Sequence, residues 1–462
     1  MDHKTARAVL DEHQQGHVLK FWDKLDDAQQ ARLLGQIESL DFKALERIRS
    51  ILAGGTSAVH AAAGPMTPAP VLALRANEAE EPRRTGEAAL AKGEVGVILV
   101  AGGQGTRLGY DGPKGTYALA PLSNASLFEI HARKILALER RHDASIPLYI
   151  MTSQANDADT RQFFKQHAFF GLTPDRVKFF TQGMLPAFWP DGRLVLEGPD
   201  RLFLAPDGHG GVLSALDRTG MLADMKRRGV TTLFFFQVDN PLVEIAEPVF
   251  IGLHVARGSE MSVKVCAKRD AAEGLGVVVL RDGRHAVVEY TELTDQQKNA
   301  RQPDGELLFK YGSVAIHIFS RTFLEREAAA GLPLHQAHKK VPFCDETGTT
   351  RKPAAANAFK FEKFIFDALP DATRPLILEF AREDEFSPVK NAEGNDSPAT
   401  ARLAMIEKAA RWLAACGVKM PRDAGGQPVY RLEIDPVYAN SADELKQRLP
   451  PGFEIGGDAL LK

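Results

Sequence analysis

Short apolar runs alternate with amphipathic stretches through the middle of the chain. The runs at residues 95–100, 148–151 and 232–237 are continuous and contain many β-branched or aromatic side chains. Continuous apolar runs of this length are typical of strands that are buried on both faces of a parallel sheet. We therefore expect the middle of the chain to contain a mostly parallel sheet.

The segment 126–141 has the period of an amphipathic helix. Ser126 is placed to cap its start, and Glu129 completes a capping box three residues later. Five side chains share one stripe of this helix: Leu127, Ile130, Lys134, Ile135 and Leu138. Strands that alternate with such helices predict an α/β fold with a central, doubly wound, mixed and mostly parallel sheet of the Rossmann-like kind.

The two ends of the chain follow other patterns. Residues 17–49 show helical spacing, with Asp26 or Asp27 as a candidate cap, and residues 52–70 have the Ala, Gly and Pro content of a linker. A helix is expected at 399–416, before a small mixed tail. The expected parts are a helical N-terminal region with linker at 1–83, a central α/β domain at 84–395 and a small C-terminal α+β domain at 396–462.

Composition and charge exclude several classes of protein. The formal net charge of −3 argues against a nucleic-acid binder or a protein of anionic membrane surfaces. The three cysteines, Cys266, Cys344 and Cys416, are far apart and favour a reducing compartment over structural zinc. The N-terminus has no apolar signal region, and no apolar stretch is long enough to span a bilayer. We expect a cytoplasmic protein.

A glycine-rich stretch follows the first apolar run. Residues 95–114 read VGVILVAGGQGTRLGYDGPK. Gly102 and Gly103 place backbone N–H groups at the end of the predicted strand, where a polyphosphate can approach without meeting a Cβ atom. Arg107 and Lys114 add positive charge. The stretch is therefore interpreted as a phosphate-binding loop, the alternative being a tight strand-to-helix turn.

Two common phosphate motifs do not explain this loop. The P-loop pattern fails because Lys114 follows a proline and precedes a glycine. The dinucleotide pattern fails because Leu108 occupies the place of its third glycine. A P-loop GTPase and a nicotinamide dehydrogenase are both poor fits.

Three further charged residues are candidates for the same site. Asp239 directly follows the strand predicted at 232–237, although Asp-Asn-Pro is also a frequent turn opener. Glu289 lies in a β-hairpin predicted around the Asp-Gly pair at 282–283. The alternative to a role in the site is that Glu289 is an exposed carboxylate on a strand. Lys390 is equally compatible with a solvated loop lysine. Pattern alone leaves these alternatives open.

Seven ordered stretches carry a resemblance to a known family. They read LVAGGQGTRLGYDGPKG (99–115), QGMLPAF (182–188), LAPDGHGG (204–211), QVDNPLV (237–243), VVEYTEL (287–293), FKFEKFIFD (359–367) and EFSPVKN (385–391). Together they resemble the eukaryotic-type UDP-sugar pyrophosphorylase (UDPGP) family, and within it the branch of UDP-N-acetylglucosamine pyrophosphorylases. GHVLKFWDKL at 16–25 is also similar to that family's leading helix, and the resemblance weakens only after about residue 420.

The resemblance implies a reaction and a set of site residues. A sugar 1-phosphate and UTP would give a UDP-sugar and pyrophosphate, with Mg²⁺ as cofactor. The implied catalytic residues are Arg107, Lys114 and Lys390, and Asp239 is the implied metal ligand. The implied UTP contacts are Gly102, Gly103 and Thr106 at the loop, and Gln182 and Gly208 at the uracil. The implied sugar contacts are His209, Gly276, Glu289, Tyr290, Ser313, Phe364 and Phe366.

Two positions bear on which sugar is used. The N-acetylglucosamine branch carries asparagines where this chain has His209 and Ser313. The glucose-type enzymes carry Gly-His-Gly at the place where this chain has Gly208-His209-Gly210. The chain length and three of the stretches still favour N-acetylglucosamine 1-phosphate. The alternatives are glucose 1-phosphate, a broad UDP-sugar pyrophosphorylase, or a UDP-sugar-binding protein without turnover. UTP and the sugar 1-phosphate are the expected partners, and the sequence leaves the oligomeric state open.

Overall fold

The computed structural model describes residues 1–54 and 64–462, which form two compact units. Unit 1 consists of Met1–Pro65, Gln182–Ser214 and Gly331–Asp367, as far as these are described. Unit 2 consists of Met66–Thr181, Ala215–Ala330 and Ala368–Lys462. Residues 55–63 of the predicted linker lie outside the described part. The division predicted at residues 83 and 395 stays a prediction.

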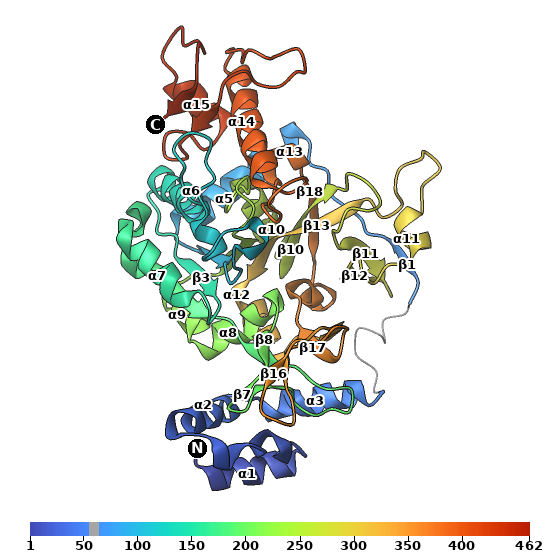
Figure 1. Cartoon of the computed structure of the whole chain (residues 1–462). Helices are drawn as coiled ribbons and strands as arrows, with labels where there is room; N and C mark the ends of the chain where they lie inside the picture. Colours follow the sequence, from blue (N-terminus) through green and yellow to red (C-terminus); the bar gives the residue numbers. More distant parts are fainter. Residues whose placement is uncertain (55–63) are drawn as a thin grey trace. The chain divides into compact units, whose positions relative to one another are not determined.

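The predicted mixed α/β fold is confirmed in unit 2 (Figure 1). Strands β2 (Val95–Val100), β3 (Leu148–Thr152), β4 (Val177–Thr181) and β9 (Thr232–Gln237) pair in parallel in the order β9-β2-β3-β4. Their core positions are buried on both sides, as the continuous apolar runs predict.

The sheet continues beyond β9 through antiparallel pairs. β13 (Tyr311–Ser320) pairs with β9, β10 (Met261–Ala267) and β11 (Val277–Arg281). The predicted hairpin is confirmed, because β11 pairs with β12 (Arg284–Val288) and both turn residues have positive φ, 50° at Asp282 and 75° at Gly283. β18 (Leu376–Glu379) runs parallel to β10.

One strand corrects the linker prediction. β1 (Met66–Pro68) lies within the predicted linker 52–70, yet it pairs antiparallel with β11. The sequence did not predict this edge strand because prolines lie in and next to it. Proline usually argues against a strand, although the edge of a sheet tolerates it.

Helices cover both faces of this sheet. On one face α6 (Leu127–His142) packs His131 against Phe236 of β9. On the other face Phe235 contacts Phe319, which stacks on Phe323 of α12 (Arg321–Ala330). The remaining helices of this region are α5 (Glu80–Ala91), α7 (Asp157–Gln166), α8 (Val212–Arg218), α9 (Met221–Arg227), α10 (Pro248–Arg257), α11 (Asp295–Asn299) and α13 (Arg382–Glu385). The doubly wound arrangement is thereby confirmed.

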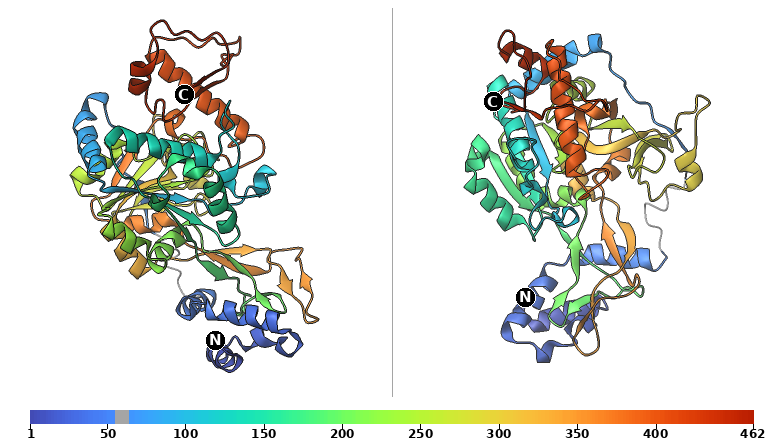
Figure 2. Two further views of the ribbon diagram at one scale, coloured as in Figure 1. Left: turned by 90° about the vertical axis from the view of Figure 1, so that its left-hand side faces the viewer. Right: turned by 45° about the horizontal axis from the view of Figure 1, so that its top comes forward.

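The C-terminal part of unit 2 has a small core of its own. It comprises α14 (Pro398–Ala415), β19 (Leu432–Ile434), α15 (Ala442–Arg448) and β20 (Ala459–Leu461), which are the orange-red to dark red segments of Figure 2. β19 and β20 pair in parallel. Leu413, Leu432 and Leu445 are fully buried there. The helix predicted at 399–416 and the mixed tail after it are confirmed.

Unit 1 combines N-terminal helices with short strands from later in the chain. The helices are α1 (His3–Glu12), α2 (Asp27–Glu38) and α3 (Phe42–Leu52). The strands pair as β5 (Met184–Pro186) with β8 (Leu204–Pro206), β6 (Leu196–Gly198) with β7 (Arg201–Leu202), β14 (His335–Lys339) with β17 (Ala358–Glu362), and β15 (Phe343–Cys344) with β16 (Thr350–Arg351). Leu33, Phe188 and Phe361 share one buried cluster.

The N-terminal helical prediction is confirmed in part. Asp26 caps α2 in a capping box, accepting a hydrogen bond from the backbone of Gln29. Residues 17–25, however, form short 3₁₀ turns at Gly16–Leu19 and Trp22–Lys24 instead of a regular helix, and α1 precedes the predicted start.

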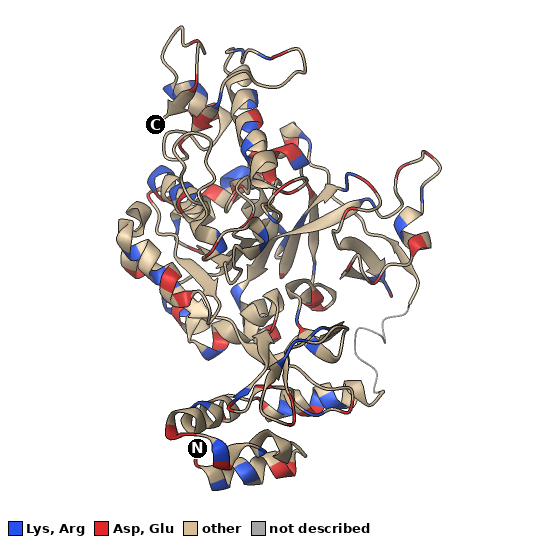
Figure 3. Cartoon of the chain, viewed as in Figure 1, with Lys and Arg blue, Asp and Glu red and all other residues tan. Residues whose placement is uncertain are grey.

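Positions of Lys and Arg (blue) and of Asp and Glu (red) are interspersed along the same helices in Figure 3. Among residues 1–54 and 64–462, no helix combines the length and apolar character that a membrane crossing requires.

Candidate functional site

The glycine loop folds back on itself at the carboxyl end of β2. The Lys114 N–H donates to the Gly103 carbonyl at 3.0 Å, and the Gly105 N–H donates to the Gly112 carbonyl at 2.9 Å. The N–H groups of Gly102 and Gly103 donate no hydrogen bond within the described residues. These two donors are thus free for an anion, as the predicted phosphate loop requires.

Asn156 fixes the start of this loop. Its Nδ2 donates to the Ala101 carbonyl at 3.0 Å and to the Gly103 carbonyl at 3.4 Å, and its Oδ1 accepts from the Ser153 N–H at 2.8 Å. Asn156 is fully buried. Sequence reasoning missed this residue because it lies at the start of α7, after the neighbouring strand β3.

Lys114 and Asp239 meet at the edge of the sheet. β2 and β9 are neighbours with Val100 opposite Gln237, so the segments after them emerge side by side. Lys114 Nζ lies 3.5 Å from Asp239 Oδ2, and both side chains are about a tenth exposed. Two residues far apart in sequence are thereby brought together at the position where open α/β sheets bind ligands.

Asp239 is also tied to the segment that carries Lys390. The Val389 N–H donates to the Asp239 carbonyl at 2.8 Å. Asn240 Nδ2 donates to the Glu385 carbonyl at 2.6 Å, and Asn240 Oδ1 accepts from the Ser387 N–H at 3.2 Å. These bonds place Lys390 in the segment next to Asp239.

Three cationic side chains could therefore serve an anionic ligand here. Arg107 is exposed in the short 3₁₀ turn Thr106–Leu108, and Lys390 is half-buried. Neither side chain forms an ion pair or hydrogen bond within the described part of the chain. Together with Lys114 they supply charge for phosphate groups without any protein nucleophile.

The carboxylate content of the site fits one kind of metal. Over the described residues there is no group of three or more His, Cys, Asp or Glu side chains that could hold an ion. Mg²⁺, however, is commonly bound by one or two carboxylates together with substrate phosphates. Asp239 alone therefore fits a Mg²⁺ ion that is shared with a polyphosphate.

A second group of predicted residues gathers around the β11–β12 hairpin of unit 2. The Ser313 N–H donates to the Gly276 carbonyl at 2.8 Å. A Cβ atom on Gly276 would lie 3.5 Å from Glu289 Oε1, so Glu289 reaches this point. Tyr290 is 42% exposed and adjoins Glu289. The hairpin therefore brings four predicted sugar contacts together.

The other predicted residues belong to unit 1. Gly208 has a φ of 83°, and a Cβ atom there would collide with the Lys363 carbonyl, so this position requires glycine. The Gly210 N–H donates to the same carbonyl at 2.9 Å. Buried Gln182 precedes Gly183, whose carbonyl accepts from the Asp207 N–H at 3.1 Å. Gln182 and Gly208 therefore flank the paired strands β5 and β8.

His209 sits within an aromatic cluster of unit 1. Its ring stacks on Phe364 with centroids 5.3 Å apart and lies 5.7 Å from Phe366. Its Nδ1 accepts a hydrogen bond from the Ile365 N–H at 3.2 Å. Burial, aided by the charge of His335, lowers the pKa of His209 to about 4, so the ring is neutral at physiological pH.

Comparison with known proteins gives a consistent result. Residues 66–447 match the UDPGP family, described as UTP--glucose-1-phosphate uridylyltransferase. The chain is 38% identical to UDP-N-acetylhexosamine pyrophosphorylase-like protein 1 of Homo sapiens, over 96% of this chain and 94% of that protein. It is 36% identical to the UDP-N-acetylglucosamine pyrophosphorylase of Saccharomyces cerevisiae, over 87% of this chain and 89% of that protein. The crystal structure of the uridine diphosphate N-acetylglucosamine pyrophosphorylase from Trypanosoma brucei in complex with an inhibitor superposes with a TM-score of 0.83, at 27% identity, over 99% and 98% of the two chains.

Proposed function

Because this chain belongs to the UDPGP family of UDP-sugar uridylyltransferases, we propose that it transfers the uridylyl group of UTP to N-acetylglucosamine 1-phosphate. One observation carries this proposal. Lys114 and Asp239 meet 3.5 Å apart beside a glycine loop whose N–H groups at Gly102 and Gly103 are free. A cation, a carboxylate and open backbone donors at one sheet edge suit a nucleoside triphosphate and its metal.

The reaction needs charge and alignment more than a protein nucleophile. A phosphate oxygen of the sugar 1-phosphate attacks the α-phosphorus of UTP in line, and the bond from that phosphorus to the bridging oxygen of the β-phosphate breaks. Pyrophosphate leaves with the bonding electrons. Arg107 would help the loop to hold UTP, Lys114 would neutralise the charge on the UTP phosphates, and Lys390 would add charge as pyrophosphate departs.

The remaining roles follow the resemblance. Gly102, Gly103 and Thr106 would bind UTP phosphates through the loop, and Asp239 would hold Mg²⁺, which supplies further charge neutralisation when bound. Gln182 and Gly208 would contact the uracil. These roles are proposals that the free loop donors and the buried Lys114–Asp239 pair support.

The choice of sugar is supported by relatives and by one site. The two relatives above, at 36% and 38% identity, are named for N-acetylated sugars. Gly276 and Glu289 lie together at the hairpin, where a carboxylate can accept hydrogen bonds from sugar hydroxyls, whereas Ser313 beside them occupies a place that is asparagine in the N-acetylglucosamine branch. His209 favours glucose 1-phosphate as a second candidate, because it too occupies a place that is asparagine in the N-acetylglucosamine branch.

Pyrophosphate release with a panel of sugar 1-phosphates tests this proposal. The whole chain is incubated with UTP, Mg²⁺ and N-acetylglucosamine, N-acetylgalactosamine, glucose or galactose 1-phosphate. We expect the highest kcat/KM with N-acetylglucosamine 1-phosphate. Release with glucose 1-phosphate alone would overturn the choice of sugar, and no release with any sugar would overturn the proposed activity.

A further inference from the structure

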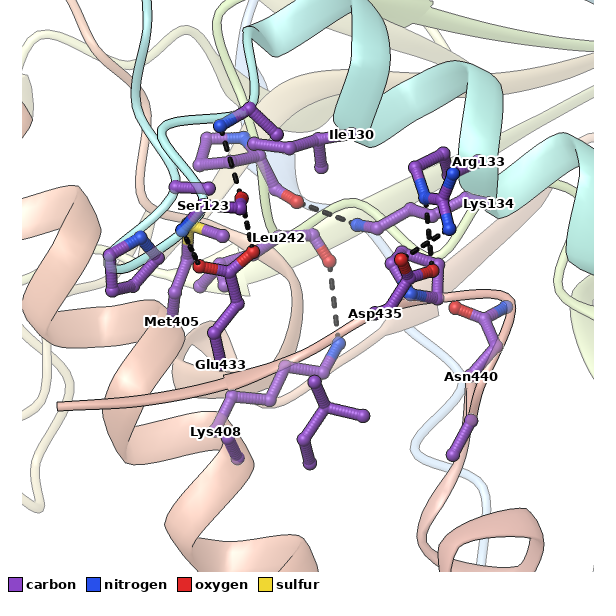
Figure 4. Close-up of a pocket in the computed structure, with 18 of the residues that line it drawn as sticks. Ser123, Ile130, Arg133, Lys134, Leu242, Met405, Lys408, Glu433, Asp435 and Asn440 are labelled. Carbon is purple, nitrogen blue, oxygen red and sulfur yellow. Dashed lines mark hydrogen bonds and ion pairs between the residues drawn. The ribbon is translucent and has the colours of Figure 1, made fainter. Parts of the chain in front are cut away.

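A cavity of about 310 Å³ lies inside unit 2, apart from the residues assigned above (Figure 4). Helices α6 and α14, the C-terminal strands β19 and β20, and residues 241–244 form its walls. The last of these segments follows Asp239 closely in the chain. The volume is at the lower end of the range for small-molecule sites, about 300–1,000 Å³.

Two charged side chains of the lining, Arg133 and Glu433, are held by local partners. Arg133 pairs with Asp435, with Nε 3.0 Å from Oδ1. Glu433 accepts hydrogen bonds from the Leu122 and Ser123 N–H groups at 2.7 and 2.8 Å. Figure 4 shows the Arg133–Asp435 pair and the contact between Ser123 and Glu433.

Lys408, on α14, is also held by local partners. Its Nζ lies 2.9 Å from Glu244 Oε1 and donates to the Asp384 carbonyl at 2.7 Å. It therefore has a carboxylate partner and a second acceptor.

Lys134 is the cation of this lining that is buried without a carboxylate partner among the described residues, and Glu433 likewise has no cationic partner there. The Lys134 side chain is 91% buried, since it is 9% exposed, and it forms no ion pair within the described residues. Its Nζ donates to the Pro241 carbonyl at 2.6 Å and to the Val243 carbonyl at 2.8 Å. An ammonium group has three donors, so one remains. Burial, and then the charge of Lys408, lower the pKa of Lys134 to about 7, although the charges of Glu244 and Glu385 act in the opposite direction.

The rest of the lining is largely apolar. Side chains from four of the wall segments contribute, among them Ile130, Leu242, Met405, Trp412 and Leu432. Such a wall favours an apolar body, and an aromatic ring can stack on Trp412. A ligand for this cavity needs one anionic group and a compact apolar part.

We propose that this cavity is a binding site for a small amphipathic carboxylate. The carboxylate accepts the third donor of Lys134 Nζ, and the apolar body packs among Met405, Trp412 and Leu432. The site does not depend on the proposed reaction, since none of the residues assigned to UTP or the sugar lines it.

Two matched probes test the proposal on the whole chain. 2-Naphthoate carries the carboxylate, and 2-naphthamide has nearly the same shape without the charge. Titration calorimetry is carried out about one pH unit below the pKa of about 7, where Lys134 is mostly protonated. We expect 2-naphthoate to bind roughly tenfold more tightly than 2-naphthamide, because a hydrogen bond to a charged group contributes that much.

Two variants locate the binding. Lys134→Met keeps the length of the side chain without its charge, and it should remove the preference for 2-naphthoate. Lys92→Met, at an exposed lysine after α5, is the matched control and should keep it. Met405→Trp fills the cavity and leaves Lys134 intact, so it should weaken binding of both probes even where Lys134→Met fails to fold.

Three results would overturn the proposal. They are no saturable binding of either probe to the unaltered chain at millimolar concentration, equal affinities for the two probes, and binding to a folded Met405→Trp variant as tight as to the unaltered chain.

Discussion

Lys114 and Asp239 hold opposite charges in a place where few solvent molecules reach either. Without a polyphosphate each neutralises the other at 3.5 Å. With UTP and Mg²⁺ bound, the account gives Lys114 to phosphate oxygens and Asp239 to the metal. Each of the two side chains therefore has a partner of opposite charge both with and without substrate. For this reason the pair costs little folding stability, although both residues are suited to binding a ligand.

The first prediction concerns Lys114→Ala. Because Lys114→Ala leaves the nearly buried Asp239 without the cation 3.5 Å away, the melting temperature should fall by a moderate amount while the chain stays folded. Loss of a phosphate-binding cation should lower kcat/KM by roughly 100- to 1,000-fold. Steady-state pyrophosphate release and thermal unfolding measure both, with Lys92→Ala as an exposed control. Unchanged activity would remove Lys114 from the site.

For single residues, the sequence predicts a place in the site only where the residue follows a strand directly. Asp239 and the glycine loop were predictable because the carboxyl ends of parallel strands share one edge. Asn156 was not, since it contacts the loop from a different segment. Lys134 could have been noticed, because it is a lysine on an otherwise apolar helical stripe, but its cavity is assembled from segments about 300 residues apart in sequence.

Among the helices, α5 and α10 depend on two glycines where they cross. A Cβ atom on Gly86 would collide with the Pro248 carbonyl, and one on Gly252 would collide with the Pro82 carbonyl. The two backbones therefore approach more closely than any side chain allows. Glycine is unfavourable within a helix, so its presence at both positions indicates that close packing outweighs helix propensity.

The second prediction follows from this crossing. Gly86→Ala and Gly252→Ala should each lower the free energy of unfolding by more than about 2 kcal/mol, because the helices must separate. Gly35→Ala in α2 is the matched control, since a Cβ atom there meets nothing within 4 Å. It should raise stability by roughly 0.5–1 kcal/mol. Denaturant titration distinguishes the outcomes, and similar effects at all three positions would contradict the packing argument.

Element prediction succeeded where the pattern was long and regular. β2, β9, α6 and the hairpin at Asp282 were predictable because each repeats one period over several residues or contains a specific turn pair. The short 3₁₀ turns near Trp22 were not, since a few apolar residues fit a helix equally well.

For the molecule as a whole, stability should depend on buried neutral histidines. His254 of α10 is 3% exposed, and its Nδ1 lies 2.8 Å from Ser262 Oγ. Burial lowers its pKa from 6.5 to about 4. In the unfolded chain the same ring takes up a proton below pH 6.5, so acid favours unfolding.

The third prediction is a window of acid sensitivity. As the pH falls from about 6.5 to about 4, His254 should lower the free energy of unfolding by roughly 3 kcal/mol, because the unfolded state binds its proton first. Below pH 4 this contribution no longer changes. His254→Gln, which keeps a polar side chain but does not titrate, should have a shallower pH dependence across this window. Equal slopes for the two proteins would contradict the assignment.

The arrangement into compact units was beyond sequence reasoning. Unit 1 is assembled from three separate stretches, and two of them interrupt the strand–helix alternation of unit 2. Nothing in local periodicity indicates that residues 182–214 and 331–367 pack with the N-terminal helices, because that depends on long-range burial.

The central claim is uridylyl transfer itself, and phosphorus NMR tests it most directly. The whole chain is mixed with UTP, Mg²⁺ and N-acetylglucosamine 1-phosphate, and the phosphorus signals are followed over time. We expect UDP-sugar and pyrophosphate to appear together at equal rates as UTP and the sugar 1-phosphate disappear. Unchanged UTP, or release of inorganic phosphate without a UDP-sugar, would contradict the central claim.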